Sequence, residues 1–439
     1  MVTLVAIDPG HFHAALAQKT MPPGVDGTAY VFAPDGAELD AHLRLVDGFN
    51  ARAASPTAWR EVVYRGDDFL ERFRGAAESG AFGERPVVVL AGKNDRKCDY
   101  ALAAIEAGCH VLADKPLAIS SDSLAKVERM AHLAESRALC FADMMTERHS
   151  LVSILRRELS SDRDLYGEQE AGSPDDPAVV MSSVHHFCKL VDGTPLRRPA
   201  WYYDVSVQGE GIADVTTHLV DQVQWTLFPS ACLSSGDANV VCAATWPTVL
   251  SPAEFELSTG VKLRQPLSVE SNGAFTWLLR GVCCKVSVEW RFMAEQGAGD
   301  THHSLMRGTN AELCVRQGAA EAYRPTLYVR SRRDAGATEA ALACAIERLS
   351  ARWPGICAVQ AGERGLWRIE TPEGLDPGHE GHFGEVVTDF LLRIDSGRVR
   401  GDELSNMLVK YRTIVEARNL AHETRSSTKG GVAWQGAES

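Results

Sequence analysis

The chain has 439 residues, more than one ordinary hydrophobic core accommodates, so two domains are expected. Hydrophobic residues make up 45% of it and charged residues 23%, as is typical of soluble globular proteins. The net charge of −13 comes without a basic patch, which argues against nucleic acid and anionic membranes as partners.

Targeting signals are not evident in the chain. The N-terminus, MVTLVAID, reaches an aspartate before any long apolar run, so we expect no signal peptide. An apolar stretch of about 18 residues, which a membrane-spanning helix needs, does not occur. The 11 cysteines are scattered without a CxxC unit, which indicates reduced thiols. A cytoplasmic location is therefore predicted.

The first part of the chain alternates buried apolar runs with amphipathic segments. The expected strands are 3–8, 29–34, 60–66, 86–92, 110–114 and 138–144. The expected helices between them are 11–21, 37–46, 67–77, 95–108 and 121–136. Continuous Val, Ile and Leu strands between such helices predict a parallel sheet covered on both faces. Residues 1–148 are therefore predicted to form a doubly wound α/β domain of the dinucleotide-binding (Rossmann) type.

The pattern changes after residue 148. A loop at 168–178 is followed by long strand-like runs, with one early helix at 211–226. Three later helices are expected at 337–351, 382–394 and 402–424. This predicts a second, α+β domain over 149–425 with a large, mainly antiparallel open sheet. Residues 426–439 are expected to be a polar tail.

The first turn of the N-terminal domain is a poor match to a dinucleotide turn. Such a turn uses glycines where the backbone meets the pyrophosphate, and only Gly10 is present here. Asp8 takes the place of the first glycine and His13 that of the third. His11 and His13 could donate hydrogen bonds to a phosphate, or the segment could be a tight turn without a ligand. Asp35, after the second strand, could accept from an adenosine ribose and favour NAD over NADP, or be an ordinary turn residue.

Polar residues also follow the fourth, fifth and sixth strands, where open parallel sheets bind ligands. Asn94 follows the fourth strand, Asp114 and Lys115 the fifth, and Arg148 the sixth. Lys115 precedes a proline, which bars the helical region for its backbone and so directs its side chain. The alternative is a solvated lysine at the start of a loop.

The stretch GEGIADVTTHLVDQ, residues 209–222, combines glycines with Asp214, His218 and Asp221. On a helix these three side chains would share one face. A carboxylate one turn before an imidazole can orient it and raise its basicity. The two glycines would let another segment approach the start of the helix. A surface Asp/His pair is the alternative.

These two segments together resemble a known family. ADKPLAIS, residues 113–120, resembles the EKP signature of the glucose–fructose oxidoreductase, inositol dehydrogenase and MocA-like family, with Asp114 replacing the usual glutamate. GEGIADVTTHLVDQ resembles the family's GGG…D-x-G-x-H-x-x-D element. The resemblance covers the whole chain and looks like a branch with an extended C-terminal domain. It implies bound NAD(P) and a sugar, cyclitol or related polyol as substrate. Asp35 makes NAD the expected cofactor, with NADP less favoured.

The resemblance also implies roles for individual residues. Catalytic roles fall on the motif lysine, aspartate and histidine, which are Lys115, Asp214 and His218. The predicted cofactor contacts are Gly10, His11, Phe12, Asp35, Asn94, Asp114 and Lys115, and the resemblance assigns Gly10, Asn94 and Lys115 among them. Lys93 and Lys97 replace the family's usual proline and histidine, which weakens the match in the cofactor region. The family also implies a homo-oligomer, a dimer or tetramer, formed through the C-terminal sheet.

Other residues could line the substrate pocket. Histidines occur in pairs at 185–186, at 302–303 and at 379 with 382. Neighbours in a strand point to opposite faces, so only one of each adjacent pair can face a pocket. Without the spacing of a known metal motif we expect no metal. Arg148, His186, Trp201 and His382 are predicted substrate contacts, with core or interface roles as the alternative.

The predicted function is NAD(P)-dependent hydride transfer to or from a secondary ring hydroxyl of a sugar or glycoside, with oxidation at C3 as one possibility. Two alternatives stay open at this point. One is a glycosidase that oxidises C3 only transiently, and the other is a non-catalytic sensor of a sugar or nucleotide on the same fold.

Overall fold

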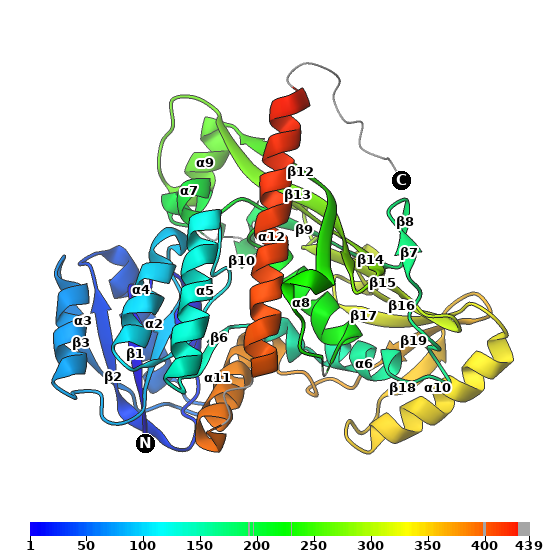
Figure 1. Cartoon of the computed structure of the whole chain (residues 1–439), viewed down its shortest axis with the longest axis horizontal. Helices are drawn as coiled ribbons and strands as arrows, with labels where there is room; N and C mark the ends of the chain where they lie inside the picture. Colours follow the sequence, from blue (N-terminus) through cyan, green and yellow to red (C-terminus); the bar gives the residue numbers. More distant parts are fainter. Residues whose placement is uncertain (192–193, 196, 230, 398–400, 429–439) are drawn as a thin grey trace.

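A computed structural model describes residues 1–191, 194–195, 197–229, 231–397 and 401–428. Its N-terminal part contains a six-stranded parallel sheet (Figure 1). The strands, in spatial order, are β3 (Arg60–Arg65), β2 (Val25–Ala33), β1 (Val2–Ile7), β4 (Pro86–Leu90), β5 (His110–Ala113) and β6 (Phe141–Asp143). The order reverses between β1 and β4, where doubly wound sheets bind their ligands. The predicted Rossmann-type domain is confirmed.

Helices cover both faces of this sheet. The five helices between the strands are α1 (His13–Leu16), α2 (Ala37–Ala51), α3 (Phe69–Glu78), α4 (Asn94–Glu106) and α5 (Ser121–Ser136). One face packs on α3, α4 and α5, and the other on α1 and α2. The helix predicted at 11–21 is much shorter than expected, because the chain leaves the helix at Ala17 and turns.

The C-terminal part contains a nine-stranded sheet. Its strands, in spatial order, are β12 (Ala238–Leu250), β13 (Leu267–Leu279), β14 (Val282–Met293), β9 (Val179–Cys188), β15 (Thr301–Arg307), β16 (Ala311–Gln317), β17 (Thr326–Ser331), β19 (Leu366–Glu370) and β18 (Cys357–Gln360). Only β14 and β9 pair in parallel within it. Two short hairpins, β7 (Gly172–Ser173) with β8 (Asp176–Pro177) and β10 (Leu190–Val191) with β11 (Thr194–Pro195), lie outside it. The predicted antiparallel sheet is confirmed.

Helices pack on one face of this sheet and form its core. These are α6 (Leu151–Ser160), α8 (Thr216–Leu227), α10 (Ala335–Ser350) and α12 (Gly401–Thr428). The remaining helices are α7 (Val205–Gln208), α9 (Pro252–Thr259), α11 (Gly378–Ser396) and the 3₁₀ helices η1 (Thr146–Arg148), η2 (Ala200–Tyr203), η3 (Ser235–Asp237) and η4 (Ala319–Glu321). Strand residues with exposed apolar side chains include Val241, Val249 and Val359. The predicted homo-oligomer stays a prediction.

The last two helices return to the N-terminal domain. Phe383 and Phe390 of α11 pack with Val2 and Val87 against the face that carries α1 and α2. Helix α12 lies between the two sheets (Figure 1), and its residues enter both cores. The residues from the region predicted as a separate second domain therefore complete the Rossmann core, and α12 fixes the two sheets relative to each other.

A buried group of charges reinforces this junction. The ammonium of Lys410, on α12, lies 2.8 Å from a carboxylate oxygen of Asp143 and 2.8 Å from one of Asp221. Arg148 donates two hydrogen bonds of 2.7 Å to the Asp221 carboxylate. The Lys410 side chain is 0% exposed. The group joins the end of β6, α8 and α12, so Asp221 has a structural role.

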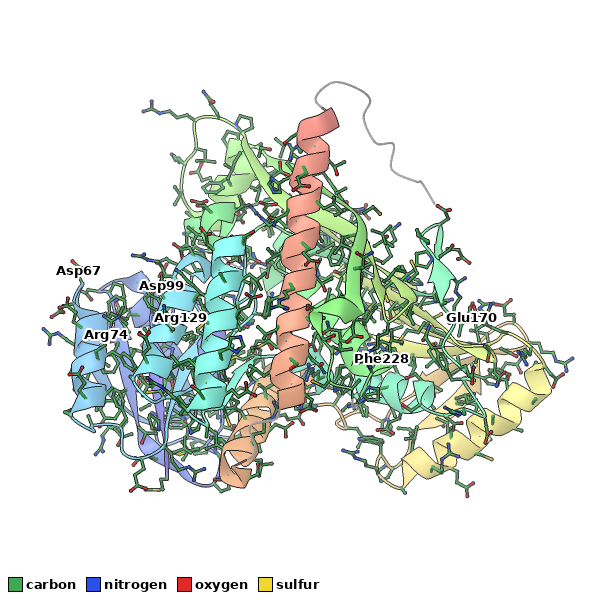
Figure 2. The ribbon with its side chains drawn as sticks, in the orientation of Figure 1. Asp67, Arg74, Asp99, Arg129, Glu170 and Phe228 are labelled. Carbon is green, nitrogen blue, oxygen red and sulfur yellow. The ribbon has the colours of Figure 1, made fainter. Side chains whose placement is uncertain are left out.

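Charged side chains project from the outer surface. Figure 2 shows Asp67, Arg74 and Arg129 on the N-terminal domain. Among the described residues, no helix combines the length and apolar character that crossing a bilayer requires. The predicted cytoplasmic location stays a prediction.

Helix α12 extends to Thr428, beyond the predicted boundary at 425, and the rest of the predicted tail lies outside the described residues.

We expect Lys410→Ala to lower the free energy of unfolding by about 3 kcal/mol, because it leaves two buried carboxylates short of a counter-charge. The matched control is Arg129→Ala, which removes an ion pair whose partners are 66% and 43% exposed. Such a pair contributes less than about 1 kcal/mol. Urea unfolding of both variants checks this, and equal losses would contradict the structural role of Lys410.

Candidate active site

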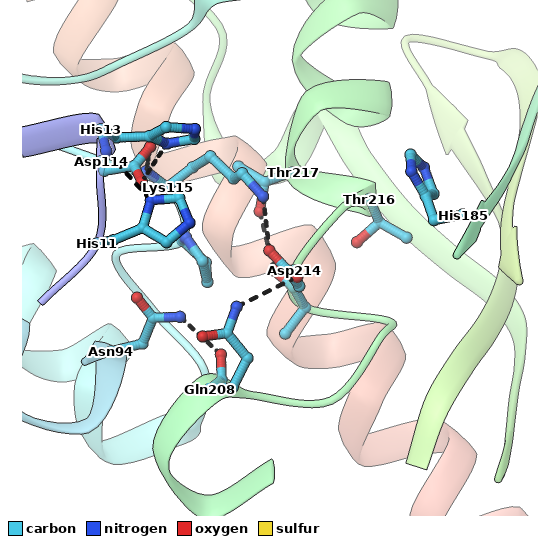
Figure 3. A network of polar contacts seen from close by, with 12 residues as sticks. His11, His13, Asn94, Asp114, Lys115, His185, Gln208, Asp214, Thr216 and Thr217 are labelled. Atoms are coloured by element: carbon cyan, nitrogen blue, oxygen red, sulfur yellow. Dashed lines mark hydrogen bonds and ion pairs between the residues drawn. The ribbon is translucent and has the colours of Figure 1, made fainter. Parts of the chain in front are cut away.

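The site is organised by an ion pair between the two parts of the chain. Lys115 follows β5, and its ammonium donates a 2.6 Å hydrogen bond to Asp214 Oδ1 (Figure 3). Gln208 Nε2 donates to the other carboxylate oxygen at 3.3 Å. The two charged side chains are only 14% and 6% exposed. Burial opposes both charges, but the carboxylates of Asp214 and Asp114 raise the pKa of Lys115 above its usual value. The pair is therefore charged at neutral pH.

Glycines allow Asp214 to reach this position. A Cβ on Gly211 would lie 1.7 Å from the carbonyl oxygen of Ser271, so only glycine permits this approach to β13. Gly209 has a φ of +93° and packs against Ile119. The expectation that the two glycines admit a neighbouring segment is confirmed. The predicted helix 211–226 begins only at Thr216, so Asp214 lies in the turn before α8.

Three residues hold the backbone around Lys115. Asp114 Oδ1 accepts a 2.9 Å hydrogen bond from the Lys115 backbone N–H, and Oδ2 lies 2.9 Å from His13 Nδ1. Lys97, which is buried, donates to the carbonyl oxygens of Asp114 at 2.8 Å and Pro116 at 3.3 Å. Burial lowers the pKa of Lys97 to about 8. The sequence marked Lys97 only as a departure from the family, and its supporting role was missed.

His218 lies on α8, one turn after Asp214. Its Nδ1 is buried and has no hydrogen-bond partner among the residues that the structure describes. Burial, followed by the charge of Lys115, lowers the pKa of His218 to about 3. The imidazole is therefore neutral at physiological pH. Asp214 does not accept a hydrogen bond from the imidazole, as its predicted orienting role would require, because its carboxylate accepts from Lys115 and Gln208 instead.

Asp214, His218 and Asp221, predicted to share one helix face, therefore face different surroundings. Asp214 contacts Lys115, whereas Asp221 contacts Arg148 and Lys410 on the side of α12. Gln222, one turn beyond His218, contacts the buried Arg156 of α6. A one-residue step turns a helical side chain by about 100°, so the 221 and 222 positions face different neighbours.

The cofactor turn has an unusual composition but a compatible backbone. Asp8 adopts a φ of +46°, the region that the missing glycine would favour. A Cβ on Gly92 would lie 2.4 Å from the Asp8 carbonyl oxygen, so β1 and β4 end in close contact. The Phe12 ring is 46% exposed at this turn. An exposed ring beside Gly10, at the reversal of strand order, fits a dinucleotide.

His11, His13 and Asp114 form a compact group beneath this turn. One ligand-type atom from each lies within 4.8 Å of the others. The hydrogen bond between His13 and Asp114 accounts for the arrangement without an ion. Burial, with the neighbouring His13, lowers the pKa of His11 well below its usual value, so that imidazole is neutral. The expectation of no metal stays a prediction.

Two predicted cofactor residues are engaged elsewhere. Asn94 is buried, with its amide nitrogen donating to the Gln208 carbonyl at 2.6 Å and its oxygen accepting from Lys97 at 2.5 Å. Asp35 is exposed, and its carboxylate pairs with Arg65 at 2.8 Å. Asn94 therefore joins the two parts of the chain, and Asp35 points toward β3.

Two predicted substrate residues also lie elsewhere. Arg148 is committed to Asp221, so its guanidinium is part of the buried charge group. Trp201 reaches the cofactor side of the molecule, where its indole N–H donates to Glu38 at 2.5 Å. Neither contact could be predicted, because each joins segments far apart in the sequence.

The predicted substrate contacts His186 and His382 lie in two different environments. His185 and His186 both contact the carboxylate of Asp300, at 3.2 Å and 3.0 Å. Alternation along β9 places His185, rather than the predicted His186, on the sheet face of the buried Met181, which belongs to the same core as residues of α8. His382 is buried and lies 2.8 Å from Asp376, which, against the effect of burial, raises its pKa. Its contact with substrate stays a prediction.

Glu147 is a further polar group that the sequence prediction did not assign. It lies on η1, directly before Arg148, and is half-buried. No hydrogen bond or ion pair engages its carboxyl group within the described part of the chain. Burial raises its pKa, against the opposing charge of His382. Glu147 is therefore a candidate proton donor near the histidines of the C-terminal sheet.

Comparison with known proteins gives the family. The "Putative oxidoreductase C terminal domain" model matches residues 155–422, and the "Oxidoreductase family, NAD-binding Rossmann fold" model matches residues 81–143. No curated protein sequence matched the chain. A crystal structure described as a putative oxidoreductase from Parabacteroides merdae is 42% identical, with a TM-score of 0.92, and the match covers 96% of this chain and 98% of that one.

More distant structures share the fold. Levoglucosan dehydrogenase, in complex with NADH and levoglucosan, has 15% identity and a TM-score of 0.61, with 96% of this chain and 97% of that one covered. A 3-ketoreductase from Actinomadura kijaniata, in complex with TDP-benzene and NADP, has 14% identity and a TM-score of 0.56, with 95% and 97% covered. The domain matches, the near-complete coverage of the P. merdae protein and the paired motifs agree, and the chain belongs to the glucose–fructose oxidoreductase, inositol dehydrogenase and MocA-like family of NAD(P)-binding oxidoreductases.

Proposed function

We propose that the protein transfers hydride between NAD and a secondary ring hydroxyl of a sugar or glycoside. The observation that carries this proposal is the buried Lys115–Asp214 pair beside the neutral imidazole of His218, whose Nδ1 has no hydrogen-bond partner among the described residues. Lys115 follows the carboxyl end of β5, at the sheet edge where the strand order reverses between β1 and β4 and where a dinucleotide binds. A levoglucosan dehydrogenase in complex with NADH and levoglucosan, and a 3-ketoreductase in complex with TDP-benzene and NADP, share the fold and support the substrate class.

The chemistry requires a proton acceptor and stabilisation of negative charge. His218 is neutral, so its ring can accept the proton of the substrate hydroxyl. The ammonium of Lys115 can donate a hydrogen bond to the same oxygen and stabilise the developing alkoxide. NAD, when bound, supplies the acceptor for the hydride that leaves the carbon. In the reverse direction His218, once protonated, returns the proton to the carbonyl oxygen.

Asp214 has a supporting role in this scheme. Its carboxylate fixes the Lys115 ammonium from one side and favours its charged form. Lys115 therefore orients the substrate as a cation and does not act as a neutral base. Asp114 and Lys97 fix the backbone on the other side of Lys115. The lysine can thus donate from a defined position.

Glu147 favours one alternative function. A glycosidase that oxidises C3 transiently needs a second proton-transfer group, to protonate the departing glycosidic oxygen. The free carboxyl of Glu147, with its raised pKa, has the chemistry for that task. The two functions differ in whether NADH accumulates.

The proposal is tested with purified protein, NAD or NADP, and a panel of monosaccharides, disaccharides and aryl glycosides. Absorbance at 340 nm and mass spectrometry of the products are followed together. We expect NADH to accumulate with a product two mass units lighter than the substrate. Glycoside cleavage without NADH accumulation would instead support the transient-redox glycosidase.

We expect His218→Ala to lower kcat/KM by about 10² to 10⁴, the usual contribution of a general base. Calorimetric titration should show unchanged NAD affinity, because His218 belongs to the C-terminal part of the chain. His303→Ala, which removes an exposed histidine of β15, serves as the matched control and should retain wild-type kcat/KM. Full turnover by the His218 variant would exclude the assigned base.

The pH profile provides an independent test. A base with an ordinary histidine pKa near 6.5 loses about tenfold in kcat/KM per pH unit below that value. The pKa of His218 is lowered to about 3, so its neutral, proton-accepting form persists as the pH falls. We expect kcat/KM to change less than about threefold between pH 7 and pH 5. A tenfold decline per unit beginning at pH 6.5 would contradict the buried, neutral state of His218.

A further inference from the structure

A carboxylate lies over the one glycine of the cofactor turn. Glu38 is in the first turn of α2, and a Cβ built on Gly10 would lie 3.1 Å from its Oε2. In doubly wound domains the pyrophosphate and the adenosine half of a dinucleotide pass over this turn. Glu38 therefore projects toward the space that the adenosine ribose would occupy.

The Glu38 carboxylate is held by donors from two segments. Lys93, after β4, donates from its ammonium to Oε2 at 3.0 Å. Trp201, in the C-terminal part of the chain, donates from its indole to Oε1 at 2.5 Å. Each carboxylate oxygen can accept two hydrogen bonds, so each retains capacity for a ligand hydroxyl. The carboxylate is 32% exposed and is thus half-buried at the turn.

Asp35, the acid expected from the sequence for this role, has a different environment. Its side chain is 74% exposed and pairs with Arg65 at 2.8 Å. Arg65 also binds Asp40 at 2.8 Å, so two carboxylates neutralise its guanidinium. The Asp35 carboxylate is therefore engaged on the β3 side, and the Arg65 guanidinium is compensated rather than available for a phosphate.

We propose that Glu38, and not Asp35, accepts hydrogen bonds from the adenosine ribose hydroxyls and so selects NAD over NADP. The inference rests on the proposed function, since it assumes a bound dinucleotide. A carboxylate is an acceptor for two hydroxyl donors, which matches the vicinal diol of NAD. A 2′-phosphate carries about −1.5 to −2 charges at pH 7, so the carboxylate repels it. Asp8 contributes further negative potential, because its charge acts on the same turn as that of Glu38.

The test is calorimetric titration of NAD and of NADP into the wild-type protein, Glu38→Gln and Asp35→Asn. We expect the wild type to bind NAD at least about tenfold more tightly than NADP, because the ribose hydroxyls of NAD can donate hydrogen bonds to the charged carboxylate of Glu38. Glu38→Gln keeps the shape and removes the charge, and should reduce that ratio by about tenfold or more. Asp35→Asn should leave the ratio within about twofold, because its carboxylate does not reach the ribose.

Trp201→Phe tests whether the preference for NAD depends on the Glu38 carboxylate or on the Trp201 indole that binds it. It removes the indole donor and retains Glu38, so the preference for NAD should persist. A preference of the wild type for NADP, or a ratio that changes in Asp35→Asn and not in Glu38→Gln, would overturn the assignment of Glu38 while leaving the proposed oxidoreductase intact. Failure of the wild type to bind either dinucleotide would overturn the proposed function itself.

Discussion

The Lys115–Asp214 ion pair is the interaction on which the site depends. Its two charges come from the end of a Rossmann strand and from the turn before α8, nearly a hundred residues later. Both side chains are largely withdrawn from water, where an isolated charge is costly and a paired one is tolerated. The pair therefore requires the two parts of the chain to meet in one arrangement, and it brings His218 into the same space.

Other buried polar groups maintain that arrangement. Lys97 and Asp114 fix the backbone that carries Lys115, and Asn94 ties the start of α4 to Gln208. On the far side of α8, Asp221 joins Lys410 and Arg148. Helix α8 thus presents a catalytic side and a structural side. The two carboxylates of this segment face different partners: Asp214, in the turn before α8, contacts Lys115, whereas Asp221, on α8, contacts Lys410 and Arg148.

Much of the fold could be predicted because apolar periodicity reports local structure. The runs TLVAID and PVVVLAG gave buried parallel strands, and the late amphipathic segments correspond to α10, α11 and α12. Periodicity carries no information on which sheet a helix covers. The return of α11 and α12 to the Rossmann core was therefore not foreseen.

The motif residues Lys115, Asp214 and His218 could be found from spacing, but their partners could not. Trp201 with Glu38 and Arg148 with Asp221 are pairs that exist only after the chain has folded. The choice between His185 and His186 depends on strand register, which no local pattern fixes. The start of α8 at Thr216 depends on the contact of Gly211 with β13. Sequence reasoning was thus most successful where the determinants were local.

A crystal structure of the protein with NAD and a sugar substrate would test the central claim most directly. The account predicts one ring hydroxyl at about 3 Å from both the Lys115 ammonium and a ring nitrogen of His218, the range of a hydrogen bond. The carbon bearing that hydroxyl should face the nicotinamide ring. A sugar bound with no hydroxyl in reach of Lys115, and with His218 still unpartnered, would contradict the assignment of these residues to the reaction.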